Sequence, residues 1–459
     1  MEHFGAWSLI PALVVIVTAL ISKRTLEPLL LGALIGFIIL KGPGVGDFMT
    51  DSWFSEFINA VYAVMMDPVT VWIILVCGLF GSVVALLEKA GGTLGFSDIA
   101  AKATKGRTGT LFTTWILGII VFVDDYLNAL AVGTAMRNAT DKYKVSREFL
   151  AYIVNSTGAT VCVLIPFSTW SAFMAGQLES SGAAAEGMGT ETYFATIPFI
   201  LYAWIAVIIV PLFMLKVIPV WGPMKTAELR AQAGQCLPDS TVDLYLTKEE
   251  TETPVKGKAM NFVIPMLVLA GVVVYTKDML YGVIAAILVC AILFAPQRIM
   301  KISEFFETTI NGFKDMILVL GIIVAAFILQ AANDALGLTP YVIESVEPIL
   351  SPALLPMLTF VIVGLLAFTT GSFWGVAAIA FPIIVPLADS MGVSMLLVAG
   401  AVISAASLGS HTCFYGDAVT LTSASTQIRN NDYAKAVLPI IALPFVLGCI
   451  AFLIAGIVM

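Results

Sequence analysis

The chain has 459 residues, of which 59% are hydrophobic and only 12% charged, and its mean hydropathy is +0.98. Soluble domains carry about 25% charged residues, so this composition excludes an ordinary soluble domain and indicates a polytopic membrane protein. The formal net charge of -8 excludes a general affinity for nucleic acid. The six cysteines stand singly, with no CxxC pair, which favours neither a disulfide framework nor a zinc site.

Apolar segments predict membrane helices along most of the chain. In the first half they cover 7–21, 26–40, 69–87, 111–136, 149–165 and 197–220, and in the second half 262–275, 280–293, 317–331, 358–387, 395–408 and 437–459. Several are shorter than the ~20 residues that a perpendicular helix needs to cross ~30 Å. We therefore expect tilted or broken helices within an all-α polytopic membrane protein.

The second series of segments repeats the first. At an offset of 248 positions Phe112 matches Phe360, Ser156 matches Ser404 and several further residues are identical. The order of segments also matches: two spans, an amphipathic stretch, a span, two broken segments and a last span. We expect two homologous repeats, 1–221 and 260–459, joined by a polar cytoplasmic linker, 222–259.

Lys and Arg residues in the loops predict an orientation. Basic loops stand on both sides of segment 111–136, which fits a re-entrant hairpin that enters and leaves on the cytoplasmic side. The flanks of the matching second segment, 333–356 and 388–394, hold no Lys or Arg, so that hairpin should enter from outside. About five full spans, one hairpin and one unwound helix per repeat would make the repeats inverted. If the broken segments cross fully, there are twelve spans and the repeats are parallel.

A doublet of carboxylates, Asp124 and Asp125, interrupts the apolar segment 111–136. An unpaired charge in hydrocarbon loses its water and gains nothing in return. The doublet is therefore expected to be buried against protein, wet, or bound to a cation. The structural alternative is that these acids cap a half-helix or pair with Arg107 or Arg137.

Further polar interruptions lie at membrane depth in 155–160, 166–169, 371–372 and 407–417. Non-helical backbone is tolerated there only where it lines a cavity, because its freed N–H and C=O groups need partners. Two hairpin tips that meet two unwound helices would form a central site, whose oxygen atoms suit a hard cation such as Na⁺. The candidate ion- and substrate-binding residues are Asp124, Asp125, Asn128, Asn155, Ser156, Thr157, Ser168, Thr169, Ser372, His411 and Asp417, with Asp124, Asp125 and Asp417 as Na⁺ ligands.

Each of these candidates has a structural alternative. His411 either relays protons near neutral pH or is a satisfied core histidine. The polar residues 155–157 either bind the ion or repair broken backbone hydrogen bonds, and Asp417 either binds the ion or caps the polar segment after it. Trp170 and Trp374 either pack or line a pocket.

The stretch 122–170 reads FVDDYLNALAVGTAMRNATDKYKVSREFLAYIVNSTGATVCVLIPFSTW. Its DDY, VGxxMR, SRE and LAYI elements resemble the signature of the NhaC family of Na⁺/H⁺ antiporters, within the larger ion transporter superfamily. The resemblance implies a secondary transporter of the inner (plasma) membrane, with inverted repeats, re-entrant hairpins and a homodimer. Carried over position by position, it implies functional roles for Asp124, Asp125, Asn128, Arg137, Asp141, Ser156, Thr157, Ser168, His411 and Asp417.

The chain departs from the family pattern at two positions. Asn155 stands where the family commonly has Asp, and Ser410 replaces the first Asp of a later motif that resembles GDHCSPISDT. Each change removes a potential cation ligand or proton carrier. Some relatives move organic acids or amino acids, and the aromatic Phe414 and Tyr415 would suit such a solute.

These features lead to an ion-coupled secondary transporter, most simply a Na⁺/H⁺ antiporter that works at a carboxylate site without a cofactor. The first alternative is Na⁺- or H⁺-coupled transport of an amino acid or organic acid. The remote alternative is an intramembrane aspartyl protease, since two membrane-depth acids can form a catalytic pair. No ATP-binding P-loop motif is evident, so an ion gradient is the expected source of energy.

Overall fold

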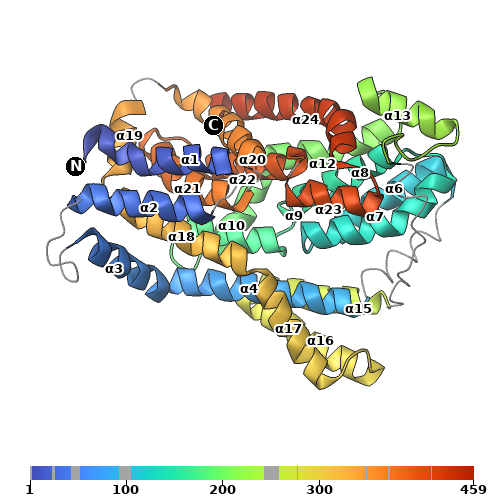
Figure 1. Cartoon of the computed structure of the whole chain (residues 1–459), viewed down its shortest axis with the longest axis horizontal. Coiled ribbons are helices and arrows are strands. Elements are labelled where there is room, and N and C mark those ends of the chain that lie inside the picture. The colour runs from blue at the N-terminus through green and yellow to red at the C-terminus, as the bar shows by residue number, and fades with distance from the viewer. Residues whose placement is uncertain are drawn as a thin grey trace.

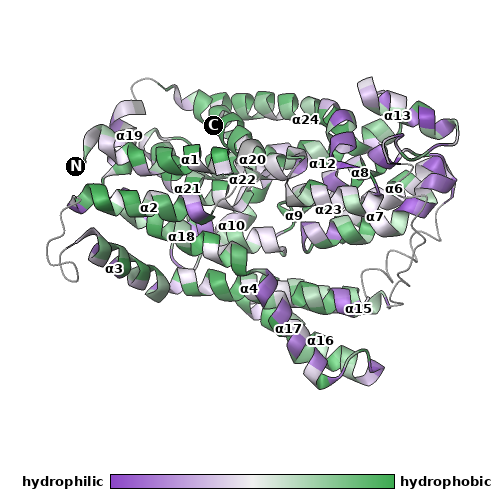
Figure 2. Cartoon of the chain, in the orientation of Figure 1, coloured by the Kyte–Doolittle hydropathy of each residue, from purple (hydrophilic) through white to green (hydrophobic). Residues whose placement is uncertain are grey.

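The computed structural model describes residues 3–22, 26–42, 52–91, 105–241, 258–276, 278–346, 350–370, 373–414 and 416–459. Within these ranges the secondary structure is helical and contains no strand, which confirms the expected all-α class. Most of the helices run roughly along the long axis of the molecule, as Figure 1 shows. Figure 2 shows that apolar residues dominate the middle of this bundle.

The helices fall into two series. The first comprises η1 (Gly5–Leu9), α1 (Ile10–Ser22), α2 (Leu26–Lys41), α3 (Trp53–Met66), α4 (Pro68–Lys89), α6 (Gly106–Ile120), α7 (Asp125–Lys142), α8 (Arg147–Ser156), α9 (Ala159–Cys162), α10 (Thr169–Ser180), α11 (Gly189–Thr196), η2 (Ile197–Phe199), α12 (Leu201–Met214) and α13 (Gly222–Gln232). The second comprises α15 (Met260–Thr276), α16 (Met279–Gln297), α17 (Ile302–Asp315), α18 (Ile317–Ala335), α19 (Leu338–Val346), η3 (Pro352–Leu354), α20 (Leu355–Thr370), α21 (Phe373–Ser390), α22 (Met395–Thr412), α23 (Asp417–Thr426) and α24 (Asn430–Val458).

Local sequence signals explain where several of these helices begin. Asp67 caps α4 by accepting the backbone N–H of Thr70 at 2.8 Å, and Pro68 supplies the fixed φ of the first helical position. Asp278 caps α16 in the same way, through the N–H of Leu280. These two capping residues lie just before the apolar runs 69–87 and 280–293.

Six helical stretches in the described residues are long and apolar enough to cross a membrane: α4, α16, Ile302–Ala335, α21, α22 and α24. A seventh span is possible where α11–η2 and α12 meet at a bend of 52°. Three shorter apolar helices cover 5–18, 260–276 and 352–368. This mixture of full and short helices agrees with the expectation of tilted or broken spans.

The two series of helices pack on each other reciprocally. α2 and α3 lie against α18, while α16 and α17, which occupy the same places in the second series, lie against α4. Likewise α12 packs on α22 while α24 packs on α8, and α7 packs on α23 while α10 packs on α21. An exchange of equivalent contacts is what two related repeats around a pseudo-two-fold axis produce. The limits of the repeats, 1–221 and 260–459, stay a prediction.

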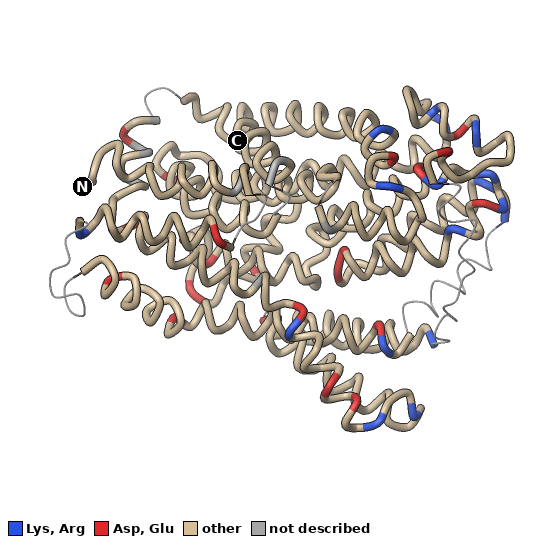
Figure 3. The backbone as a smooth tube through the Cα atoms, viewed as in Figure 1, with Lys and Arg blue, Asp and Glu red and all other residues tan. Residues whose placement is uncertain are grey.

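Each series contains a helical hairpin. The bases of α6 and α7 meet where Arg107 Nη1 donates to the carbonyl of Lys144 at 2.6 Å. The bases of α20 and α21 meet in a buried apolar cluster that includes Leu355 and Leu387. In Figure 1 the bases of the two hairpins lie toward opposite ends of the molecule. Figure 3 shows that many Lys and Arg residues gather at the end near α6 and α13. This arrangement has the opposed orientation that inverted repeats require.

The first part of the expected linker contains helix α13, which is docked on the first series of helices. Arg230 Nη2 on α13 lies 2.8 Å from both carboxylate oxygens of Glu148 at the start of α8. Glu228 accepts the N–H and hydroxyl of Ser146 at 3.0 and 2.8 Å and pairs with Arg107 at the base of α6. These contacts hold α13 against the base of the first hairpin. Residues 242–257 of the linker lie outside the described part.

The reactivity of Cys236, just after α13, is a measure of this docking. Its Sγ lies 3.7 Å from the carbonyl of Asp141, and burial raises the pKa of its thiol to about 11. Because the thiolate is the reactive form, a raised pKa leaves less of it at pH 8. In a variant whose other five cysteines are Ala, we expect maleimide to label Cys236 at least ~100-fold more slowly than a free thiol. Arg230→Ala should speed the labelling; equal rates with and without Arg230 would contradict the docking.

Candidate functional site

Asp124 ends the short tip of the first hairpin and caps α7. Its Oδ1 accepts the backbone N–H groups of Tyr126 and Leu127 at 3.0 and 3.1 Å, and its Oδ2 accepts the hydroxyl of Thr169 at 3.0 Å. The capping alternative is thus realised for this acid. Pairing with Arg107 is not observed, since Arg107 binds Glu228 and Lys144 instead.

Asp125 begins α7 and faces the second series of helices. Its Oδ1 accepts the indole N–H of Trp170 at 3.1 Å, and the hydroxyl of Ser410 on α22 lies 3.5 Å from its Oδ2. Only 3% of Asp125 and 8% of Asp124 is exposed. Within the described ranges neither carboxylate forms an ion pair with a basic side chain. Among the described residues the acid pair therefore has hydrogen-bond donors but no basic partner, an arrangement that a cation or a proton would stabilise.

Asn128 ties the hairpin tip to the break after α8. Its amide nitrogen lies 2.6 Å from the carbonyl oxygen of Gly118, 3.0 Å from that of Val121 and 3.1 Å from that of Thr157. Its Oδ1 is buried and has no hydrogen-bond partner within the described residues. The amide nitrogen of Asn128 thus binds carbonyl groups at breaks in the helices, and its oxygen has no partner among the described residues.

The contact between Gly118 and Thr157 leaves no space for a side chain. A Cβ at Gly118 would lie 1.9 Å from Thr157 Oγ1, whereas a Cβ at Gly271, within helix α15, would meet nothing within 4 Å. Gly118→Ala should therefore destabilise the protein by about 1–3 kcal/mol through overpacking. Thermal unfolding in detergent checks this, with Gly271→Ala as the matched control. Equal unfolding temperatures for the two variants would argue against the close contact.

His411 lies at the centre of a second polar network. Its Nε2 lies 2.9 Å from the hydroxyl of Ser156 at the end of α8, and its Nδ1 lies 2.8 Å from the hydroxyl of Tyr202 on α12. Its carbonyl accepts the amide of Asn155 at 3.0 Å and the hydroxyl of Tyr433 at 2.9 Å. Both ring nitrogens have hydroxyl partners, so the imidazole is hydrogen-bonded inside the core, as the structural alternative for His411 expects.

The remaining candidates differ in what they touch. Ser168 caps α10 and donates to the carbonyl of Cys162 at 2.5 Å, whereas its neighbour Thr169 contacts Asp124 directly. Thr157 bonds to carbonyls of its own helix. Asp141, implied by the family resemblance, binds Arg147 through two bonds of 2.6 and 2.7 Å at the other end of α7.

Two candidates come from breaks in the second half, at the tip of the second hairpin and at the start of α23. Ser372 lies outside the described residues, as does Tyr415, and the side chain of Asp417 also lies outside them. The backbone of Asp417 begins α23 directly after Gly416, where a Cβ would lie 3.1 Å from the ring of Phe373. The start of α23 is therefore next to the tip of the second hairpin.

The start of α10 meets the tip of the second hairpin at aromatic rings. The ring centroid of Trp170 lies 4.8 Å from that of Trp374 and 6.2 Å from that of Phe373, at the start of α21. Sequence reasoning left open whether Trp170 and Trp374 pack or line a pocket, and it treated Ser410 only as a lost acid. The only hint of a role for Trp170 in the sequence was its position two residues after Ser168, in the first turn of the helix that Ser168 caps.

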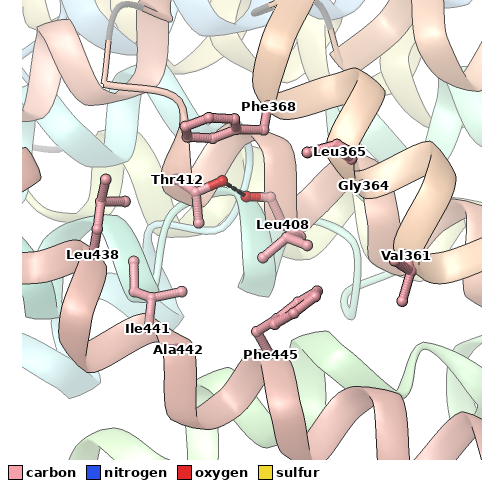
Figure 4. A pocket seen from close by; sticks show the side chains of 10 residues that line it. All are labelled: Val361, Gly364, Leu365, Phe368, Leu408, Thr412, Leu438, Ile441, Ala442 and Phe445. Atoms are coloured by element: carbon pink, nitrogen blue, oxygen red, sulfur yellow. Dashed lines mark hydrogen bonds between the residues drawn. The ribbon is translucent and has the colours of Figure 1, made fainter.

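A separate apolar cavity lies between α20, α22 and α24. Its volume is about 300 Å³, and Figure 4 shows its lining, which includes Phe368, Leu408, Thr412 and Phe445. Its lining residues include no carboxylate, and the hydroxyl of Thr412 is bonded to the carbonyl of Leu408 at 2.6 Å. This cavity is thus distinct from the acid pair.

The sequence model described as the Na⁺/H⁺ antiporter family matches residues 186–457, which is more than half of the chain. The chain belongs to this family. An uncharacterized protein of Haemophilus influenzae is 26% identical, over 98% of this chain and 91% of that protein. The NhaC-type resemblance carried by 122–170 is thus confirmed.

Two solved structures share the fold of this chain. One is MtrF of Neisseria gonorrhoeae, described as one of a class of antimetabolite efflux pumps, with a TM-score of 0.59, 14% identity and coverage of 94% of both chains. The other is the YdaH transporter of Alcanivorax borkumensis, described as having an unusual topology, with a TM-score of 0.62, 12% identity and coverage of 94% and 97%. At these identities the likeness shows the fold alone.

The family to which the chain belongs consists of membrane antiporters. The protein is therefore a multi-pass secondary membrane transporter and not an enzyme. The alternative of an intramembrane aspartyl protease is set aside on this ground.

Proposed function

We propose that the protein exchanges Na⁺ for H⁺ at the acid pair, with Asp125 as the group for which the two ions compete. The observation that carries this proposal is a buried carboxylate pair that has no basic partner among the described residues. Such an acid is tolerable when it is neutralised by a proton or by a cation. Because both cannot occupy the same carboxylate, binding of one ion releases the other.

The two acids have different parts in this proposal. Asp124 receives two backbone N–H groups and lies at the amino end of α7, where the helix dipole favours an anion. It serves as the fixed anionic side of the Na⁺ site. Asp125, with one good donor and one long contact, exchanges its proton. Asp417, at the start of α23, is proposed as a further Na⁺ ligand from the second half.

Opposed hairpins suit alternating access, because each leads from one side of the molecule to the same buried site. Na⁺ and H⁺ are then cargo, and no cofactor is required. We place the protein in the inner (plasma) membrane and expect a homodimer, as the family resemblance implies. The site itself lies within one chain.

The test is proton movement in proteoliposomes that contain a trapped pH dye. A pulse of external NaCl should drive protons out of vesicles that hold the wild-type protein, while choline chloride should not. A protonophore should collapse the signal. If NaCl and choline chloride give the same trace, the proposal fails.

One observation favours a second candidate, Na⁺- or H⁺-coupled transport of an amino acid or organic acid. Trp170 donates to Asp125 and belongs to an aromatic cluster with Trp374 and Phe173, which would suit the apolar part of a solute. In a thermal-shift screen, this candidate requires a solute that stabilises the protein only when Na⁺ is present. Stabilisation by Na⁺ alone, with no responsive solute, would favour plain ion exchange.

A further inference from the structure

Trp170 is one side chain with contacts at both hairpin tips. It is fully buried in the first turn of α10, and its indole N–H donates to Asp125 Oδ1 at 3.1 Å. Its ring lies against Trp374 and Phe373, the first two residues of α21. The carboxylate of the first hairpin and the tip of the second are thus joined through a single rigid ring system.

A second ring of α10 strengthens this contact. Phe173, three residues after Trp170 and on the same face of the helix, meets the ring of Trp374 edge-on at 4.9 Å and 89°. Stacked and edge-to-face pairs have preferred geometries, so these rings resist sliding past one another. A displacement of Trp170 should therefore move the start of α21 with it.

The indole N–H and a bound Na⁺ would share the oxygen atoms of Asp125. The indole can only donate, and a hydrogen bond to an ionised carboxylate is roughly twice as strong as one between neutral groups. A Na⁺ ion at Asp125 competes for the same oxygen lone pairs. Its binding or release therefore changes how strongly the Trp170 ring is held in place.

Other ionisable groups surround this bond. Asp124 precedes Asp125 in the chain, and Cys162 after α9 and Glu88 at the end of α4 lie within electrostatic range of the acid pair. His411 follows Ser410 on α22, and the backbone of Asp417 lies at the start of α23. None of them touches both Asp125 and α21 through a contact that the structure describes, as Trp170 does.

We propose that Trp170 is the positioning residue that links Na⁺ occupancy at Asp125 to the placement of the second hairpin tip. The inference rests on the proposed function of Asp125. Na⁺ at Asp125 changes the strength of the indole hydrogen bond, and the packed rings carry the change to α21.

The experiment breaks the link at each end separately. Trp170→Phe keeps an aromatic ring and removes the N–H, whereas Trp374→Leu keeps the N–H and removes the ring that lies 4.8 Å from that of Trp170. Trp204→Phe is the matched control, since Trp204 is 40% exposed and donates only to the carbonyl of Ile197 in its own segment. Each variant is assayed for the maximal rate of Na⁺-driven proton movement and for thermal stabilisation by Na⁺.

We expect both site variants to lose about tenfold in maximal rate, the scale of one hydrogen bond to a charged group. Stabilisation by Na⁺ should persist, because the carboxylates remain. The double variant should be no slower than the slower single variant, since both changes break one link. A wild-type rate in Trp170→Phe, or losses that multiply in the double variant, would overturn the inference. Absence of Na⁺-driven exchange in the wild type would instead refute the proposed function.

Discussion

Replacing Asp125 by Asn should abolish Na⁺-dependent proton exchange, lowering its rate at least ~100-fold, equivalent to roughly 3 kcal/mol. The amide keeps the shape of the side chain and accepts the indole N–H of Trp170, but it carries no exchangeable proton and no charge. Fluorescence of a trapped pH dye in proteoliposomes measures the loss directly.

Asp124→Asn is the matched control for this change. Asn is as good a helix cap as Asp, so α7 should still begin at the same residue. The variant should bind Na⁺ more weakly yet keep measurable exchange, because Asp125 still carries the proton. Wild-type exchange in Asp125→Asn, or a deeper loss in Asp124→Asn, would reverse the assigned parts.

Removal of Arg230 should cause the largest loss of stability. Glu148 is only 4% exposed and relies on the guanidinium of Arg230 at 2.8 Å. Arg230→Leu leaves this carboxylate buried without its partner, at a cost of about 3–5 kcal/mol. Thermal unfolding in detergent should show a clearly lower midpoint than the wild type.

Two controls separate the ion pair from the general loss of charge. Lys225→Leu removes an exposed cation from the same helix and should change stability by no more than about 0.5 kcal/mol. The double variant Glu148→Gln, Arg230→Leu should recover part of the loss, because no unpaired charge remains. An equal midpoint for the Arg230 and Lys225 variants would contradict the buried pair.

The fold class could be predicted because it depends on apolar length and on flanking charges, which each segment of the sequence shows without reference to the rest of the chain. Apolar length marks the membrane helices, and the basic flanks of 111–136 mark a hairpin whose base lies where Arg107 meets Lys144. The family resemblance came from 122–170, whereas the family's sequence model matches 186–457. Two different parts of the chain therefore point to the same family.

The site could be predicted only in part, because residue types do not reveal their distant partners. The cost of burying Asp124 and Asp125 singles them out from sequence alone. That Asp124 caps α7 while Asp125 reaches Ser410, 285 positions away, depends on how the two halves pack. The role of Trp170 follows from the same packing.

The linker shows the same limit. Its polar composition predicted a linker between the repeats but could not show that Glu228 and Arg230 bind partners on α6 and α8. In a sequence, charged residues that are solvated cannot be told from charged residues that form buried ion pairs. Which of the two occurs depends on whether the residue is buried, and here burial depends on the helices of the first hairpin.

Proton release on Na⁺ binding tests the competition at Asp125 most directly. Purified protein in weakly buffered detergent solution is titrated with NaCl while the pH is recorded, and choline chloride corrects for ionic strength. The wild-type protein should release protons in step with Na⁺ binding, and Asp125→Asn should release none. Na⁺ binding by the wild-type protein without any proton release would contradict the account.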